Sequence, residues 1–120
     1  MALSSCNDAK LEMYKSIVQE ADKFEICYKS TNKIITIPDQ HIDKFKDILT
    51  RNVKPEALRK LIYDTRVNIF KNNNQIAFIT IAFGNKNPFA NFISDSLNFS
   101  FQLTYGIGMT LDNYSSLNSR

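Results

Sequence analysis

Strict alternation of apolar and polar residues near the carboxyl end is the strongest periodic signal in this 120-residue chain. In the stretch LNFSFQLTYGIGMTL, which begins at Leu97, every second residue is apolar. Because side chains of a β-strand point alternately to the two sides of a sheet, the pattern predicts a strand with one dry face. The two glycines of this stretch weaken a strand. We therefore predict a strand from 97 to at least 105 and leave strand and terminal helix open for 106–115.

Three further segments before this strand complete a predicted antiparallel meander. RVNIFK (66–71) and QIAFITIAF (75–83) flank three asparagines, a residue type that tolerates the left-handed backbone of a hairpin turn. Almost every side chain of 75–83 is apolar or small, which is typical of a strand covered on both faces and therefore central. FANFIS (89–94) is expected to form a short edge strand.

The amino-terminal half switches between helical and strand patterns. Apolar residues recur with helical spacing and predict a helix over 8–22: Leu11, Tyr14, Ile17, Val18 and Ala21. KFEICYK and KIITIP each have a period of two, and the turn signal STN separates them, so we predict a hairpin over 23–37. A second helix is predicted over 39–51 with Asp39 as its N-cap.

A third, short helix is expected to start at Pro55, because proline suits the first turn of a helix. Its apolar residues, predicted to face inward, are Leu58, Leu61 and Ile62.

These elements predict an α+β fold, a two-layer domain in which helices pack on an antiparallel sheet. The sheet is expected to hold about four to five strands, from the 23–37 hairpin and the 66–105 meander, with helices 8–22 and 39–51 packed on it. The predicted buried core includes six residues, each on the predicted apolar face of a strongly periodic element: Phe45, Leu49, Phe78, Ile81, Phe101 and Leu103.

The chain has the length of one domain. We expect residues 7–115 to form it, residues 1–6 to be a disordered leader or lipid tether, and residues 116–120 to be a frayed tail. The net charge is +3, and residues 65–120 carry only four Lys/Arg and two Asp/Glu. Without a basic stripe we expect no nucleic-acid partner. No apolar run approaches the ~18 residues of a membrane span, so we expect no such span.

Few residues suggest catalysis or metal binding. His41 is the single histidine, and Asp39, Asp43 and Asp47 follow at four-residue spacing on one predicted helix face. A metal site needs ligands that converge from separate elements, so we interpret this row as a solvated face and expect no metal and no cofactor. Cys27 and His41 form a candidate nucleophile–base pair, but no oxyanion loop accompanies them, and we expect no enzyme activity.

A small basic cluster is interpreted in the same way, as a solvated surface rather than a binding site: Arg51, Lys54, Arg59 and Lys60.

The segment LSSC, from Leu3 to Cys6, resembles the lipobox of bacterial lipoproteins. The resemblance implies that Cys6 is a lipid-attachment residue, that the polar residues after it form a tether, and that the protein works in the cell envelope. Without processing at this segment the expected location is the cytoplasm. A basic and then apolar stretch encoded before Leu3 would identify a working signal.

We expect a non-catalytic protein-binding module, the mature part of a small envelope lipoprotein if the LSSC resemblance holds. The alternatives are a toxin-neutralising immunity protein, a homodimeric structural subunit, and a small enzyme that uses Cys27 and His41. The partner would be another protein or a second copy of the chain.

The predicted contact face is the uncharged side of the meander, because a solvent-facing sheet on a free monomer usually carries Lys and Glu. Its residues are Asn68, Thr80, Asn98, Ser100 and Gln102. The competing interpretations are that an AT-rich codon bias supplies Asn in place of Lys or Glu, or that a helix covers this face.

The tether interpretation generates a first prediction. Deleting residues 1–6 should leave the melting temperature unchanged, because a tether contributes no packing to the domain. Circular dichroism melts of the full and shortened chains would measure this, and a clear drop in the shortened chain would contradict the interpretation.

Overall fold

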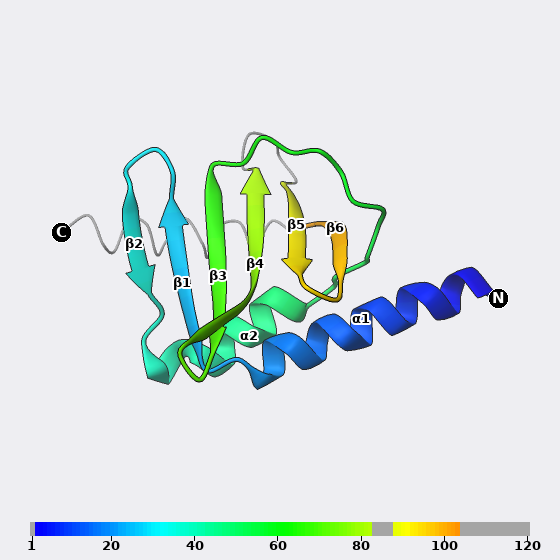
Figure 1. Cartoon of the computed structure of the whole chain (residues 1–120), viewed down its shortest axis with the longest axis horizontal. Helices are drawn as coiled ribbons and strands as arrows, with labels where there is room; N and C mark the ends of the chain where they lie inside the picture. The colour runs from blue at the N-terminus through cyan, green and yellow to red at the C-terminus, as the bar shows by residue number, and fades with distance from the viewer. Residues whose placement is uncertain (1, 83–87, 104–120) are drawn as a thin grey trace.

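A computed structural model describes residues 2–82 and 88–103, with side chains from Asp8 onward. It has the predicted α+β architecture of two layers, with six described strands where four to five were expected (Figure 1). Two helices, one short 3-10 turn and six strands follow one another along the chain: α1 (Ala2–Glu20), β1 (Lys23–Tyr28), β2 (Lys33–Thr36), η1 (Asp39–His41), α2 (Ile42–Thr50), β3 (Thr65–Lys71), β4 (Asn74–Ala82), β5 (Phe89–Ser94) and β6 (Asn98–Gln102).

The sheet joins two separate pieces of chain. Its strand order is β2-β1-β3-β4-β5-β6, and every neighbouring pair is antiparallel. The β1–β2 hairpin is therefore added to the side of the β3–β6 meander, where β1 pairs with β3. The central position predicted for 75–83 is confirmed. The edge position predicted for 89–94 is wrong, because β6 pairs with the outer side of β5.

Asparagines make the turns that the sequence indicated. Asn72 and Asn73 have positive φ values of 53° and 67° in the two-residue connection between β3 and β4. Asn32 has a φ of 55° at the end of the β1–β2 turn. Positive φ costs little for asparagine compared with most residues, so these positions favour tight hairpins.

Helix boundaries differ from the sequence predictions at two places. Helix α1 begins at Ala2, ahead of the predicted start at residue 8, and Cys6 lies within it. Asp39 is not the N-cap of α2: it opens the 3-10 turn η1 after Pro38, and His41 is the residue before α2, with no side-chain capping bond. The lipid tether and the deletion prediction are not tested by the helix start and stay predictions.

The predicted third helix is absent: no helix lies between α2 and β3. Leu58 and Ile62, predicted to face inward, are 52% and 94% exposed. The reason is topological, because this connection has to run from α2 around the β6 edge and back to the start of β3 (Figure 1). Residues 53–64, here called the strap, use their backbone groups to bond the sheet rather than one another.

The core lies between the helices and one face of the sheet. Five of the six predicted core residues are buried: Phe45, Leu49, Ile81, Phe101 and Leu103. Phe78 is only half-buried, so its prediction is wrong. Because Ile79 and Ile81 are fully buried in the core, strand alternation turns Phe78 and Thr80 to the opposite face.

Tyr14 of α1 occupies the centre of this core and is fully buried. Its hydroxyl donates a hydrogen bond of 2.7 Å to the carbonyl of Leu49 near the end of α2. Its ring meets those of Phe92 and Phe99 edge-on, with centroids 4.8 and 5.3 Å apart. Burial raises the pKa of Tyr14 far above its ordinary value, so the hydroxyl stays protonated and able to donate.

The strand predicted from 97 to at least 105 is β6, which spans Asn98–Gln102. The predictions for 106–115 and for the tail 116–120 lie outside the described residues.

The Tyr14 bond generates a second prediction. Tyr14→Phe should lower the free energy of unfolding by about 1–3 kcal/mol, because it leaves the buried Leu49 carbonyl without its donor while keeping the ring. Tyr63→Phe is the matched control, since Tyr63 is half-buried on the strap, and it should change stability little. Urea unfolding of both variants measures the difference. Equal changes in the free energy of unfolding would show that the Tyr14 hydroxyl stabilises the fold no more than the Tyr63 hydroxyl does.

Candidate functional site

The sheet face away from the helices, here called the open face, carries one row of side chains across all six strands. The strand registers place its members opposite one another, in the order Ile34, Cys27, Arg66, Thr80, Asn91 and Ser100. Asn68 and Asn98 belong to the neighbouring row, and Gln102 lies opposite Phe89. The structure therefore brings the five residues of the predicted contact face to one side of the sheet.

The strap covers one end of this row. Glu56 and Ser100 exchange two backbone hydrogen bonds of 2.7 and 3.0 Å along the outer edge of β6. The Arg59 amide donates to the Ser100 hydroxyl, and the Asn91 side-chain amide donates to the Arg59 carbonyl, both at 2.7 Å. Ser100 is consequently fully buried. Thr80 is only 9% exposed, whereas Asn98 and Gln102 are exposed.

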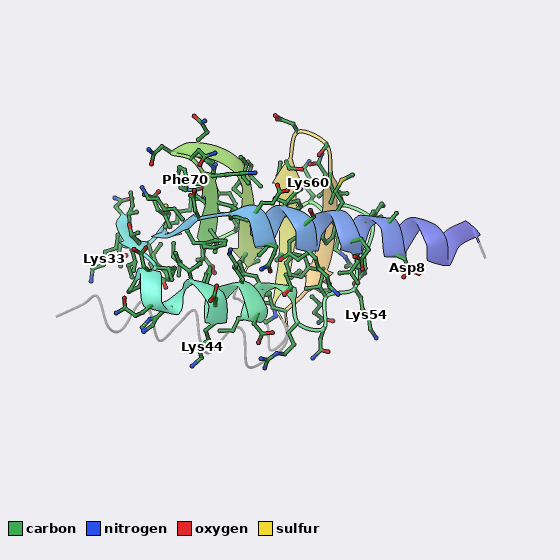
Figure 2. All side chains as sticks on the ribbon, turned by 90° about the horizontal axis from the view of Figure 1, so that it is seen from below. Asp8, Lys33, Lys44, Lys54, Lys60 and Phe70 are labelled. Carbon is green, nitrogen blue, oxygen red and sulfur yellow. The ribbon has the colours of Figure 1, made fainter. Side chains whose placement is uncertain are left out.

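The open face is not as free of charge as the sequence of the meander suggested. Four cationic side chains of the described residues lie over aromatic rings: Lys23 over Phe70, Lys29 over Tyr63, Arg59 over Phe89 and Arg66 over Phe78. Such pairs occur roughly once per 70–80 residues, so this is a concentration of them. Figure 2 shows Phe70 and Lys60 on the side of the sheet opposite Lys44 of α2.

The other end of the row opens into a cavity of about 220 Å³, here called the Cys27 pocket. Cys27, Ile34 and Tyr63 give it apolar lining, and three cationic residues also line it: Lys29, Lys33 and Arg66. Lys33 lies opposite the buried Tyr28, so strand alternation turns its side chain to the helix side of the sheet. Among the described residues that line it there is no Asp or Glu. An apolar pocket with positive charge around it suits a ligand that combines a negatively charged group with apolar surface.

Cys27 itself is a protonated thiol. Its sulfur accepts a hydrogen bond of 3.5 Å from the Asn68 amide. Burial raises the pKa of the Cys27 thiol, the nearby Glu25 carboxylate raises it further, and Arg66 and the Asn68 bond oppose the shift. A nucleophilic cysteine needs the opposite shift.

Cys27 and His41 are not brought together. Cys27 pairs with Ile34 near the beginning of β2, whereas His41 lies in η1, beyond the end of that strand. His41 does not line the Cys27 pocket. The arrangement gives Cys27 no histidine base.

The aspartate row of the second helix is split between η1 and α2, and Asp47 forms an ion pair with Arg51. Within residues 2–82 and 88–103, no group of three or more His, Cys, Asp and Glu side chains is arranged to hold a metal ion. Of the basic cluster, Arg59 pairs with Glu56 at 2.9 Å. These contacts place both sets on ordinary exposed surface.

The two edges of the sheet differ. The edge at β6 is bonded by Glu56 of the strap, but no described strand pairs with the outer side of β2. The Ile37 amide donates to the Phe24 carbonyl at 3.0 Å, so Ile35 and Lys33 also direct their backbone groups toward β1. The N–H and C=O groups of Ile34 and Thr36 therefore point outward, and the Ile34 side chain is 62% exposed.

Sequence reasoning missed this edge. Ile34 and Ile35 are adjacent in KIIT, and neighbouring residues of a strand point to opposite faces of the sheet. Only one of the two can therefore face the core, and this indicated that the other isoleucine is exposed. Lys29 and Lys33 appeared as ordinary hairpin residues. Only the pairing of β1 with β3 brings Arg66 beside them.

Comparison with protein families, with curated proteins and with solved structures found no match. Across the described part of the chain, no helix is long and apolar enough to cross a bilayer. The functional argument therefore depends on the geometry of the open face alone.

The strap contacts generate a third prediction. Asn91→Ala removes the buried amide that bonds Arg59 and also the contact of Asn91 with the Ser100 hydroxyl. Trypsin should then cut faster after Arg59 and Lys60, and the free energy of unfolding should fall by about 1–3 kcal/mol. Asn98→Ala is the control, because Asn98 lies on the same face but is exposed. It should change neither the cleavage rate nor the free energy of unfolding by much. Equal cleavage of both variants would mean that Asn91 does not hold the strap.

Proposed function

We propose that this protein is a non-catalytic module that binds a protein partner at the uncovered end of its open face. The observation that carries the proposal is the outer edge of β2, with which no described strand pairs and where the exposed side chain of Ile34 borders the Cys27 pocket. A free sheet edge offers a row of backbone donors and acceptors to an incoming strand. An exposed isoleucine beside it adds apolar area to the contact.

The proposed surface shifts away from the contact face expected from sequence. Ser100 is covered by the strap and would not touch a partner unless the strap were displaced, and Thr80 is buried as well. Asn68 is half-buried, adjoins Cys27, and belongs to the proposed surface. Asn98 and Gln102 are exposed at the far end and would contribute only to a partner that spans the whole sheet.

If the protein works in the cell envelope, the proposal includes lipid attachment at Cys6. The support is the resemblance of LSSC to a lipobox, and the anchored domain would meet its partner at a membrane surface. Sequencing the gene upstream of Leu3 tests this: a basic and then apolar stretch in the same reading frame supports it, and a stop codon directly before Met1 rules it out.

The binding proposal generates a fourth prediction. A photo-crosslinking amino acid placed at Ile34, in cells that make the protein naturally, should give an adduct with one other protein. The same amino acid at Asp43, exposed on α2, should not give this adduct. Mass spectrometry identifies the adduct.

Two results would overturn the proposal. Adducts that are absent or identical at both positions would mean that the β2 edge binds no partner. An adduct of the chain with itself, reproduced with the purified protein, would replace the partner by a second copy and make the protein a homodimer.

A further inference from the structure

We infer that the partner segment held at β2 is an extended acidic strand that adds to the sheet edge and places a carboxylate at the Cys27 pocket. This inference rests on the proposed binding function and adds the chemistry of the partner. It uses three features of the described residues: the outward backbone groups of β2, the open-face neighbours of Ile34, and the unpaired positive charge around the pocket.

The backbone geometry selects an extended polypeptide. Ile34 and Thr36 each present one N–H and one C=O to the outside, in the alternation that an added β-strand requires. Pro38 is the next residue whose backbone groups would point outward, and proline has no N–H to donate. The pairing window is therefore as short as β2 itself, Lys33–Thr36, and fits a segment of about four residues.

The side-chain geometry directs one partner residue to the pocket. In an added strand, the residue opposite Ile34 projects to the same open face, with its Cβ roughly 5 Å from that of Ile34. Ile34 lies opposite Cys27, and both line the pocket. The side chain of that partner residue consequently lies at the mouth of the pocket.

The charge of the pocket selects an acidic residue. The ion pairs among the described residues are Lys23–Glu25, Arg51–Asp47, Arg59–Glu56 and Lys71–Glu20, so none involves the three cations of the pocket. Asp64, next to Tyr63 in sequence, does not line the pocket, and its carboxylate accepts the Thr65 hydroxyl at 3.2 Å. Lys29 and Arg66, which form no ion pair among the described residues, attract a carboxylate at the pocket and disfavour a lysine there.

Aromatic rings already hold both of these cations in place. The Lys29 ammonium lies 5.0 Å from the centroid of Tyr63, and the Arg66 guanidinium lies 3.8 Å from the centroid of Phe78. The Arg66 Nε also donates to the Asn68 side chain at 2.7 Å. Cations that are ordered before binding lose less side-chain freedom when a carboxylate arrives.

The test uses three blocked pentapeptides on the whole 120-residue protein. The first alternates valine and glutamate, the second alternates valine and lysine, and the third is the acidic peptide with alternate backbone nitrogens methylated so that they cannot donate. Amide ¹H–¹⁵N spectra during titration report which residues respond. We expect only the first peptide to shift the Ile34 and Thr36 amides, with weaker binding at higher salt.

Variants separate the backbone from the charge contribution. Thr36→Pro removes one outward N–H at an edge position that tolerates proline, and should abolish binding of the acidic peptide while the protein still melts cooperatively. Lys29→Gln should weaken binding by about threefold. Lys44→Gln is the matched control, since Lys44 is exposed on α2, away from the open face (Figure 2), and should have no effect.

The outcomes distinguish this inference from the binding proposal. Equal binding of the acidic and lysine peptides, or undiminished binding of the methylated one, would overturn the inference. So would the absence of shifts at Ile34 and Thr36. If crosslinking at position 34 still traps a partner in that case, the binding function stands and only its acidic, strand-like chemistry fails.

Discussion

The hydrogen bond from the Tyr14 hydroxyl to the Leu49 carbonyl is the contact on which the arrangement of the two layers depends. It joins α1 to the last turn of α2 at 2.7 Å, inside a core where an unpaired carbonyl would be costly. The same ring packs against Phe92 of β5 and Phe99 of β6. One side chain thus connects both helices to the meander half of the sheet.

This arrangement assigns different roles to the two faces of the sheet. The helix-facing side is filled with fully buried apolar residues, among them Phe24, Ile26, Val67 and Ile79. Those residues contribute stability and are withdrawn from solvent. Interaction with another molecule is therefore directed to the open face, where side chains such as Cys27 and Arg66 are only half-buried.

The strap then divides the open face. Its bonds to Ser100 and Asn91 cover the β5–β6 end and satisfy backbone groups at that edge. Nothing equivalent lies on the β2 end in the part of the chain that the structure describes. The same connection explains why the helix expected after Pro55 does not form: residues that bond a sheet edge cannot also complete a helical ladder, and Ile62 remains 94% exposed.

What the sequence determined by itself was local. Period-two alternation located β1 and β6, and a nearly continuous apolar run located β4. Asparagines with positive φ made the hairpin turns, and the apolar spacing around Tyr14 and Phe45 located both helices. These features depend on residues close together in the chain.

Which strands become neighbours depends on contacts between distant segments. The pairing of β1 with β3 places Arg66 beside Cys27, and the path of the strap buries Ser100. Phe78 was assigned to the core because its strand is apolar throughout, and only packing against the helices decided that Ile79 and Ile81 face inward. Tertiary structure alone chose the site, because an edge is free or covered according to contacts between segments that lie far apart in the sequence.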